Sequence, residues 1–166
     1  MAEVFRGALR HRRVVKLPIL GASGRKAVII LFRFPIIDGA IDAVARLATE
    51  WPLGLASSSN RPIIELVLER SGLAECFAAV VSSEEVEHGK PAPDVYLGVA
   101  QHLGVDPAAC VAIEDSTNGI KAGLAAGMRT IAVPNREFPP EEKVLASATA
   151  VVPSLAEVTP RLVAGL

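Results

Sequence analysis

Two adjacent acids, Glu114 and Asp115, stand where a predicted strand gives way to a predicted helix. The apolar run 110–113 indicates a buried strand at residues 110–114, and a helix is expected at residues 118–126. Bringing two carboxylates together is costly unless a positive charge lies between them. Mg²⁺ is the natural candidate, because it is a hard cation that prefers oxygen ligands. The alternative is a polar turn in which Asp115 and Ser116 only cap the helix.

A second cluster of polar side chains follows an apolar strand expected at residues 53–57. Ser57, Ser58 and Asn60 stand at its end, directly before a predicted helix. Hydroxyl and amide groups beside the N–H groups of a helix start can bind a phosphate. The alternative is that these residues only cap the helix.

Lys90 lies between these clusters, in the Gly- and Pro-containing loop 88–94. A lysine held there can neutralise a phosphoryl oxygen or pair with a carboxylate, or it can be a solvated loop residue. One strand–helix unit separates each cluster from the next. His88 is expected to be a solvated loop residue. Asn135 and Arg136, which follow the strand expected at 129–133, are weaker candidates for the same crevice.

This ordered set resembles the haloacid dehalogenase-like hydrolase superfamily, and most closely its β-phosphoglucomutase-like phosphatase and mutase branch. The resemblance covers about residues 35–162. It implies that Ser57 hydrogen-bonds the transferring phosphoryl group and that Lys90 stabilises it, while Glu114 and Asp115 hold Mg²⁺. Ser58 and Asn60 would join Ser57 and Lys90 in binding a small phosphorylated metabolite.

The family's first motif is missing. In the family, an Asp-x-Asp-Gly sequence after the first strand supplies the nucleophile and the general acid/base, and no Asp-x-Asp occurs in this chain. Asp38 and Asp42 are the only aspartates before Ser57. Asp38 is expected to start a helix at 38–50, the alternative being that Asp38-Gly39 takes the nucleophile's place. Fewer than 60 residues precede Ser57, so the substrate-selecting helical cap is also expected to be absent.

These losses predict a truncated or degenerate phosphohydrolase or phosphomutase with little or no turnover. Its classification as an enzyme is therefore left open. The alternative is a non-catalytic module that binds metal, phosphate or a partner protein. A third possibility is that another chain supplies an Asp-bearing strand.

The alternation of short apolar runs with helical segments predicts an α/β fold, a Rossmann-like parallel sheet with helices on both faces. In such a sheet the carboxyl ends of the strands share one crevice, so Ser57, Lys90, Glu114 and Asp115 are expected to converge. The other elements are expected as helices at 61–71, 93–103, 141–147 and 155–163, and as strands at 78–82 and 149–152.

Residues 1–34 are expected to be a divergent basic leader, followed by the core domain at 35–166. Within the leader, residues 27–32 could form a strand in place of the missing catalytic one, with Arg33 or Phe34 near the nucleophile's position. The missing first strand and cap are expected to expose a sheet edge and to favour self-association.

Composition limits the partners. The 166 residues are 51% hydrophobic with a net charge of −1, which argues against nucleic-acid or anionic-membrane binding. The longest apolar run, 27–32, is far shorter than the roughly 20 residues of a membrane span. Cys76 and Cys110 are expected to be buried thiols, which favours a reducing cytoplasm.

Overall fold

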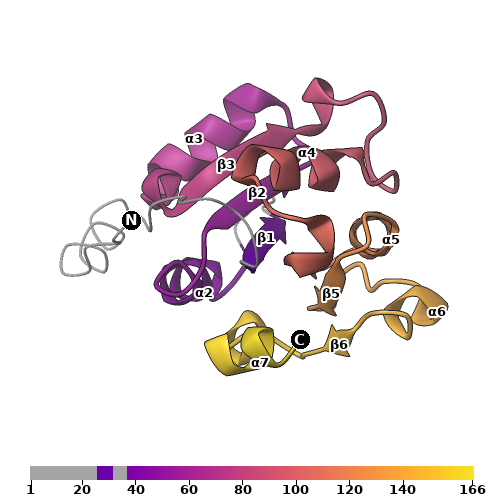
Figure 1. Cartoon of the computed structure of the whole chain (residues 1–166). Coiled ribbons are helices and arrows are strands. Elements are labelled where there is room, and N and C mark those ends of the chain that lie inside the picture. Colours follow the sequence, from indigo (N-terminus) through magenta and orange to yellow (C-terminus); the bar gives the residue numbers. More distant parts are fainter. Residues whose placement is uncertain (1–25, 32–36) are drawn as a thin grey trace.

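The computed structural model describes residues 26–31 and 37–166 of the chain. These residues form a parallel sheet in the order β3-β2-β1-β4-β5-β6 (Figure 1). Its strands are β1 (Ala27–Leu31), β2 (Leu53–Ser57), β3 (Phe77–Ser82), β4 (Cys110–Glu114), β5 (Arg129–Ala132) and β6 (Ala150–Val151). The predicted α/β fold is confirmed, and strands 53–57 and 110–114 have the predicted bounds.

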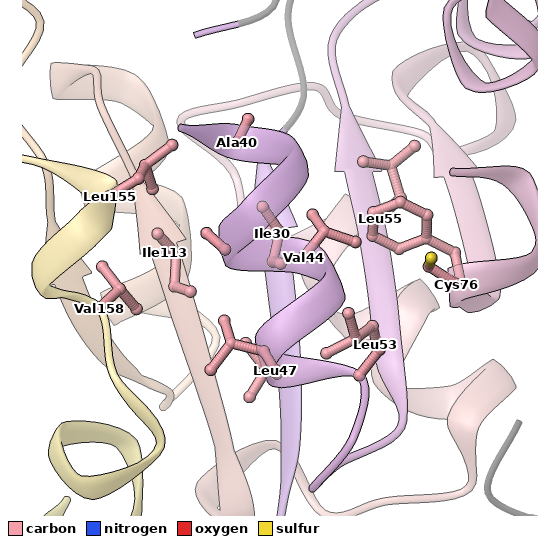
Figure 2. Packing of buried hydrophobic residues seen from close by; sticks show 14 of the residues in the cluster. Ile30, Ala40, Val44, Leu47, Leu53, Leu55, Cys76, Ile113, Leu155 and Val158 are labelled. Atoms are coloured by element: carbon pink, nitrogen blue, oxygen red, sulfur yellow. The ribbon is translucent and has the colours of Figure 1, made fainter. Parts of the chain in front are cut away.

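Helices cover both faces of this sheet. They are α2 (Ala40–Leu47), α3 (Arg61–Ser71), α4 (Asp94–Leu103), α5 (Thr117–Ala125), α6 (Glu142–Leu145) and α7 (Pro160–Gly165). Alternate residues of β1 enter different cores: Val28 and Ile30 pack with α2 and α3, whereas Ala27 and Ile29 pack with α4 and α5. Figure 2 shows Val44 and Leu47 of α2 lying over Ile30 and Leu53.

The strand predicted within residues 27–32 is present, and it occupies the centre of the sheet. Val28 pairs with Leu53 of β2 on one side and with Val111 of β4 on the other. The expectation of a sheet edge exposed by a missing first strand is therefore wrong, because β1 fills that position. The outermost strands of the described sheet are β3 and β6, and self-association remains a prediction.

Two helix predictions need correction. The expected helix 155–163 is divided into a short 3-10 helix (Leu155–Glu157) and α7. Pro160 forces the preceding Thr159 into an extended conformation, and the Thr159 side chain then caps α7 by accepting from the Leu162 N–H. The helix expected at 38–50 begins only at Ala40, after Gly39 with φ of 80°. Asp38 is exposed and does not cap this helix.

The remaining helix boundaries follow local backbone chemistry. α3 and α4 end at Gly72 and Gly104, both with positive φ, as glycine stop signals predict.

A hydrogen-bonded contact joins the residue before β1 to the end of α7. The Lys26 ammonium donates to the carbonyls of Val163 (3.1 Å) and Ala164 (2.8 Å). This contact ties the start of the central strand to the last turn of α7.

Candidate phosphoryl-binding site

The predicted lysine and acid pair meet at the carboxyl edge of the sheet. Lys90 lies in the loop before α4, and its Nζ is 2.6 Å from Glu114 Oε1 at the end of β4. The same ammonium donates to the Ala56 carbonyl in β2 at 3.3 Å, directly before Ser57. Lys90 therefore bridges the ends of two strands, which places Ser57, Lys90, Glu114 and Asp115 around one region.

Glu114 is enclosed by donors from several elements. Its side chain is fully buried, and that of Lys90 is only 4% exposed. Oε1 also accepts from the Tyr96 hydroxyl of α4, while Oε2 faces the Asp115 N–H (3.3 Å) and the Ser116 hydroxyl (3.5 Å). A buried carboxylate is tolerated only with such compensation.

The packing below Glu114 explains a glycine in the first turn of α5. A Cβ atom at Gly119 would come within 1.8 Å of Glu114 Oε2. A side chain at this position is therefore incompatible with the observed Glu114 conformation. The Ser116 hydroxyl accepts from the Gly119 N–H and caps the helix, so Ser116 has the capping contact that the alternative reading of this turn predicted.

Asp115 is oriented from the loop that follows β5. Asn135 Nδ2 donates to Asp115 Oδ2 at 3.3 Å, and the Asn135 N–H donates to the Asp115 carbonyl at 3.3 Å. Asn135 Oδ1 in turn accepts from the N–H groups of Glu137 and Phe138. The weak sequence candidate Asn135 therefore contacts the site, whereas Arg136 is exposed.

The end of β2 is also tightly organised. Ser57 is buried, and its Oγ accepts from the Ser59 N–H at 3.1 Å. Ser58 is exposed, and its carbonyl accepts from the Ser83 hydroxyl. The Asn60 side chain accepts from the Ile63 N–H and caps α3. Asn60 thus has the capping contact of the alternative interpretation, and its part in substrate binding remains a prediction.

Tyr96 is a member of this cluster that sequence reasoning missed. It is completely buried on α4, and its place among the apolar buried residues of this helix is that of an ordinary core residue. Burial, then the charge of Glu114 and the hydrogen bond to it, raise the pKa of Tyr96 well above its ordinary value. The hydroxyl therefore stays protonated and acts as a donor. Its place six residues after Lys90, on the same loop–helix unit, was the available signal.

The end of β1 differs in chemistry from the ends of β2 and β4. Leu31 is level with Ala56 of β2, and the preceding Ile30 is level with Ile113 of β4. The end of β1 therefore lies beside Ser57 and Glu114. Residue 31 carries no nucleophile, and neither does the sequence Phe-Arg-Phe-Pro-Ile at 32–36. The predicted placement of Arg33 and Phe34 lies outside the described residues.

The carboxylates of Glu114 and Asp115 offer part of the oxygen ligand set that Mg²⁺ requires. This ion takes near-octahedral oxygen ligands, and it is commonly held by one or two carboxylates together with phosphate and water. Glu114 and Asp115 supply two carboxylates, although Oε1 of Glu114 already accepts from two donors. In the described part of the chain, no group of three or more His, Cys, Asp or Glu residues is arranged to hold a metal. The residues fit an ion shared with a bound phosphate rather than a cage built by protein alone.

The family comparison agrees with this architecture. The model of the haloacid dehalogenase-like hydrolases matches residues 9–127, and the chain belongs to this family. Hydrolases of this family generally use Mg²⁺.

Individual relatives are phosphatases. Hexitol phosphatase B of Escherichia coli K12 is 46% identical over 104 residues, which are 62% of this chain and 47% of that protein. The bifunctional riboflavin kinase/FMN phosphatase of Arabidopsis thaliana is 44% identical over 108 residues, 64% of this chain and 28% of that protein. The chain thus spans half or less of the length of these relatives.

Solved structures show the same branch. CbbY from Rhodobacter sphaeroides, in complex with phosphate, superposes with a TM-score of 0.70 at 30% identity, over 79% of this chain and 59% of that one. β-Phosphoglucomutase from Clostridium difficile gives 0.65 at 27% identity, over 78% and 55%. The predicted branch of the family is therefore confirmed.

Across residues 26–31 and 37–166, no helix is both long enough and apolar enough to cross a membrane.

Proposed function

We propose that this chain is the phosphoryl-binding core of a small-metabolite phosphatase or phosphomutase, and that it turns substrate over slowly or not at all. One observation carries this proposal. The buried Lys90–Glu114 pair, 2.6 Å apart, lies beside a β1 end that has no nucleophilic side chain. The site therefore retains groups that bind a phosphoryl group but lacks the group that attacks it.

Binding of the phosphoryl group would depend on the ends of β2 and β4. The Ser57 hydroxyl and the N–H groups at the start of α3 would orient its oxygens, with Ser58 and Asn60 at the rim. The Lys90 ammonium would offset its negative charge. When bound at the acid pair Glu114–Asp115, Mg²⁺ would supply further positive charge that polarises the phosphoryl group.

The missing step is formation of the phosphorus–oxygen bond to the enzyme. In this family that bond comes from an aspartate at the end of the first strand, as the resemblance implies. Here the strand is present and its last residue is Leu31. A partner chain that donates an Asp-bearing strand is not supported, because β1 already pairs with β2 and β4. Charge stabilisation alone cannot replace a covalent step.

We also propose that the protein is located in the cytoplasm, which is a reducing compartment. Cys76 and Cys110 are both buried free thiols, as the sequence predicted. Buried unpaired thiols are typical of proteins that fold where disulfides do not form.

The test of the proposed function combines binding with turnover. Titration calorimetry with inorganic phosphate in the presence of Mg²⁺ should detect binding. An aryl phosphate under the same conditions should be hydrolysed no faster than in buffer. Robust hydrolysis that Asp38→Asn abolishes, and that the matched Asp42→Asn variant leaves unchanged, would contradict the proposal and identify Asp38 as the nucleophile.

A further inference from the structure

Tyr96 and Lys90 share one carboxylate oxygen. Both the Tyr96 hydroxyl and Lys90 Nζ donate to Glu114 Oε1. Tyr96 is completely buried, and it is the only tyrosine in the chain. It therefore makes a specific polar contact inside an otherwise apolar face of α4.

Tyr96 also contacts the lysine through its ring. Lys90 Nζ lies 4.9 Å from the ring centroid, which is within the range of a cation–π interaction. Together with Glu114 and the Ala56 carbonyl, the ring confines the ammonium from three directions. An ammonium has three N–H donors, and two of them are accounted for among the described residues. The third would donate to a phosphoryl oxygen if one is bound at this site.

We propose that Tyr96 is a positioning residue of this site, which sets how strongly Glu114 holds Lys90 and thereby how much of the lysine's charge reaches a bound phosphate. This inference rests on the proposed phosphoryl-binding function. By donating to Oε1, the hydroxyl takes part of the acceptor capacity for which Lys90 competes. Without it, Glu114 has a single strong donor at this oxygen and draws the ammonium away from the phosphate.

This role of the Tyr96 hydroxyl differs from simple core packing. A phenylalanine would fill almost the same space and keep the ring beside Lys90, so packing alone does not require the hydroxyl. Hydrogen bonds to charged groups are also stronger than those between neutral groups. The effect of losing the hydroxyl should therefore depend on the charge of its partner.

The binding experiment uses Tyr96→Phe in the full chain, with inorganic phosphate as the probe in titration calorimetry. The variant should bind phosphate about fivefold more weakly than the unaltered chain. Thr130→Val is the control, because it removes another buried hydroxyl on β5, and it should leave phosphate affinity unchanged. Equal or tighter phosphate binding by Tyr96→Phe would overturn the inference.

The unfolding experiment needs no ligand. Tyr96→Phe should lower the Tm by about 5 °C in the unaltered chain. In a Lys90→Met/Glu114→Gln background, where the partner is neutral, it should lower the Tm by less than half as much. An equal decrease in both backgrounds would overturn the inference. If the unaltered chain fails to bind phosphate, the proposed function is refuted, while this second comparison still decides whether Tyr96 acts through the charged pair.

Discussion

The carboxyl ends of β1 and β4 are neighbours in one sheet, yet they carry side chains of different chemistry. β4 ends at Glu114 and is followed by Asp115, and these two acids contact Lys90, Tyr96, Ser116 and Asn135. β1 keeps its central place and its pairing with both neighbours, but it ends at Leu31. A strand needs only apolar residues that fit two packed faces, whereas catalysis needs one carboxylate at one position. The place of β1 in the sheet is therefore independent of which residue stands at its carboxyl end.

The largest effect should come from breaking the charged pair at the end of β4. Lys90→Met leaves the buried Glu114 carboxylate without its cation, which should cost about 3–5 kcal/mol of unfolding free energy. Denaturant unfolding measures this loss. Lys90→Met/Glu114→Gln is the matched control, and it should recover most of the stability because no uncompensated charge remains. A single variant as stable as the double variant would show that the pair is not electrostatically coupled.

The second prediction concerns the packing beneath Glu114. Gly119→Ala should destabilise the protein by about 1–3 kcal/mol, because the added methyl group overlaps the Glu114 carboxylate. Gly165→Ala in α7 is the control, since a Cβ there meets nothing within 4 Å. Thermal unfolding of both variants gives the comparison. Equal Tm values for the two variants would mean that the Glu114 side chain moves aside without a loss of stability.

The third prediction places a carboxylate at the end of β1. Leu31→Asp should hydrolyse an aryl phosphate about tenfold faster than the unaltered chain, because Leu31 pairs with Ala56, directly before Ser57, and follows Ile30, which pairs with Ile113, directly before Glu114. Leu31→Asn is the isosteric control and should remain inactive. Equal rates for the two variants would show that a carboxylate at residue 31 does not attack the phosphate.

The smallest effect concerns the opposite end of β4, where Cys110 starts the strand. Burial, then the charge of Asp106, raise the pKa of the Cys110 thiol to about 11 from its ordinary 9.0. Below pH 9 the thiol is neutral in both the folded and unfolded states, so burying it contributes fully to the unfolding free energy. Between pH 9 and 11 the unfolded chain ionises more readily, and stability should fall.

The Cys110 prediction is checked by the unfolding free energy of the unaltered chain and of Cys110→Ala across this pH range. The difference between the two proteins should shrink as the pH rises from 9 to 11. A pH-independent difference would contradict the assignment of a buried neutral thiol.

Much of the fold was predictable because its signals are local. The apolar runs of β2 and β4 are bounded by polar residues, and the stops at Gly72 and Gly104 need only a positive φ. The convergence of Lys90 with Glu114 followed from the parallel topology rather than from sequence distance. These inferences depend on periodicity and connectivity, which the sequence displays directly.

Other features depend on contacts between distant residues or on the local backbone. Tyr96 occupies a position typical of the core, and only its hydroxyl contact with β4 reveals a polar role. The start of α2 depends on the positive φ of Gly39 rather than on Asp38. Pro160 divides the last expected helix, because the extended Thr159 before it starts α7 as a separate element.

The contact between Lys26 and the carbonyls of Val163 and Ala164 has a consequence for biosynthesis. More than 130 residues separate its two sides, so the start of β1 acquires this partner only after residue 164 has left the ribosome. Closing so long a stretch of chain is entropically costly and slow. Until then, a nascent chain has the apolar face of β1 but lacks α7, and apolar surface left uncovered in this way favours aggregation.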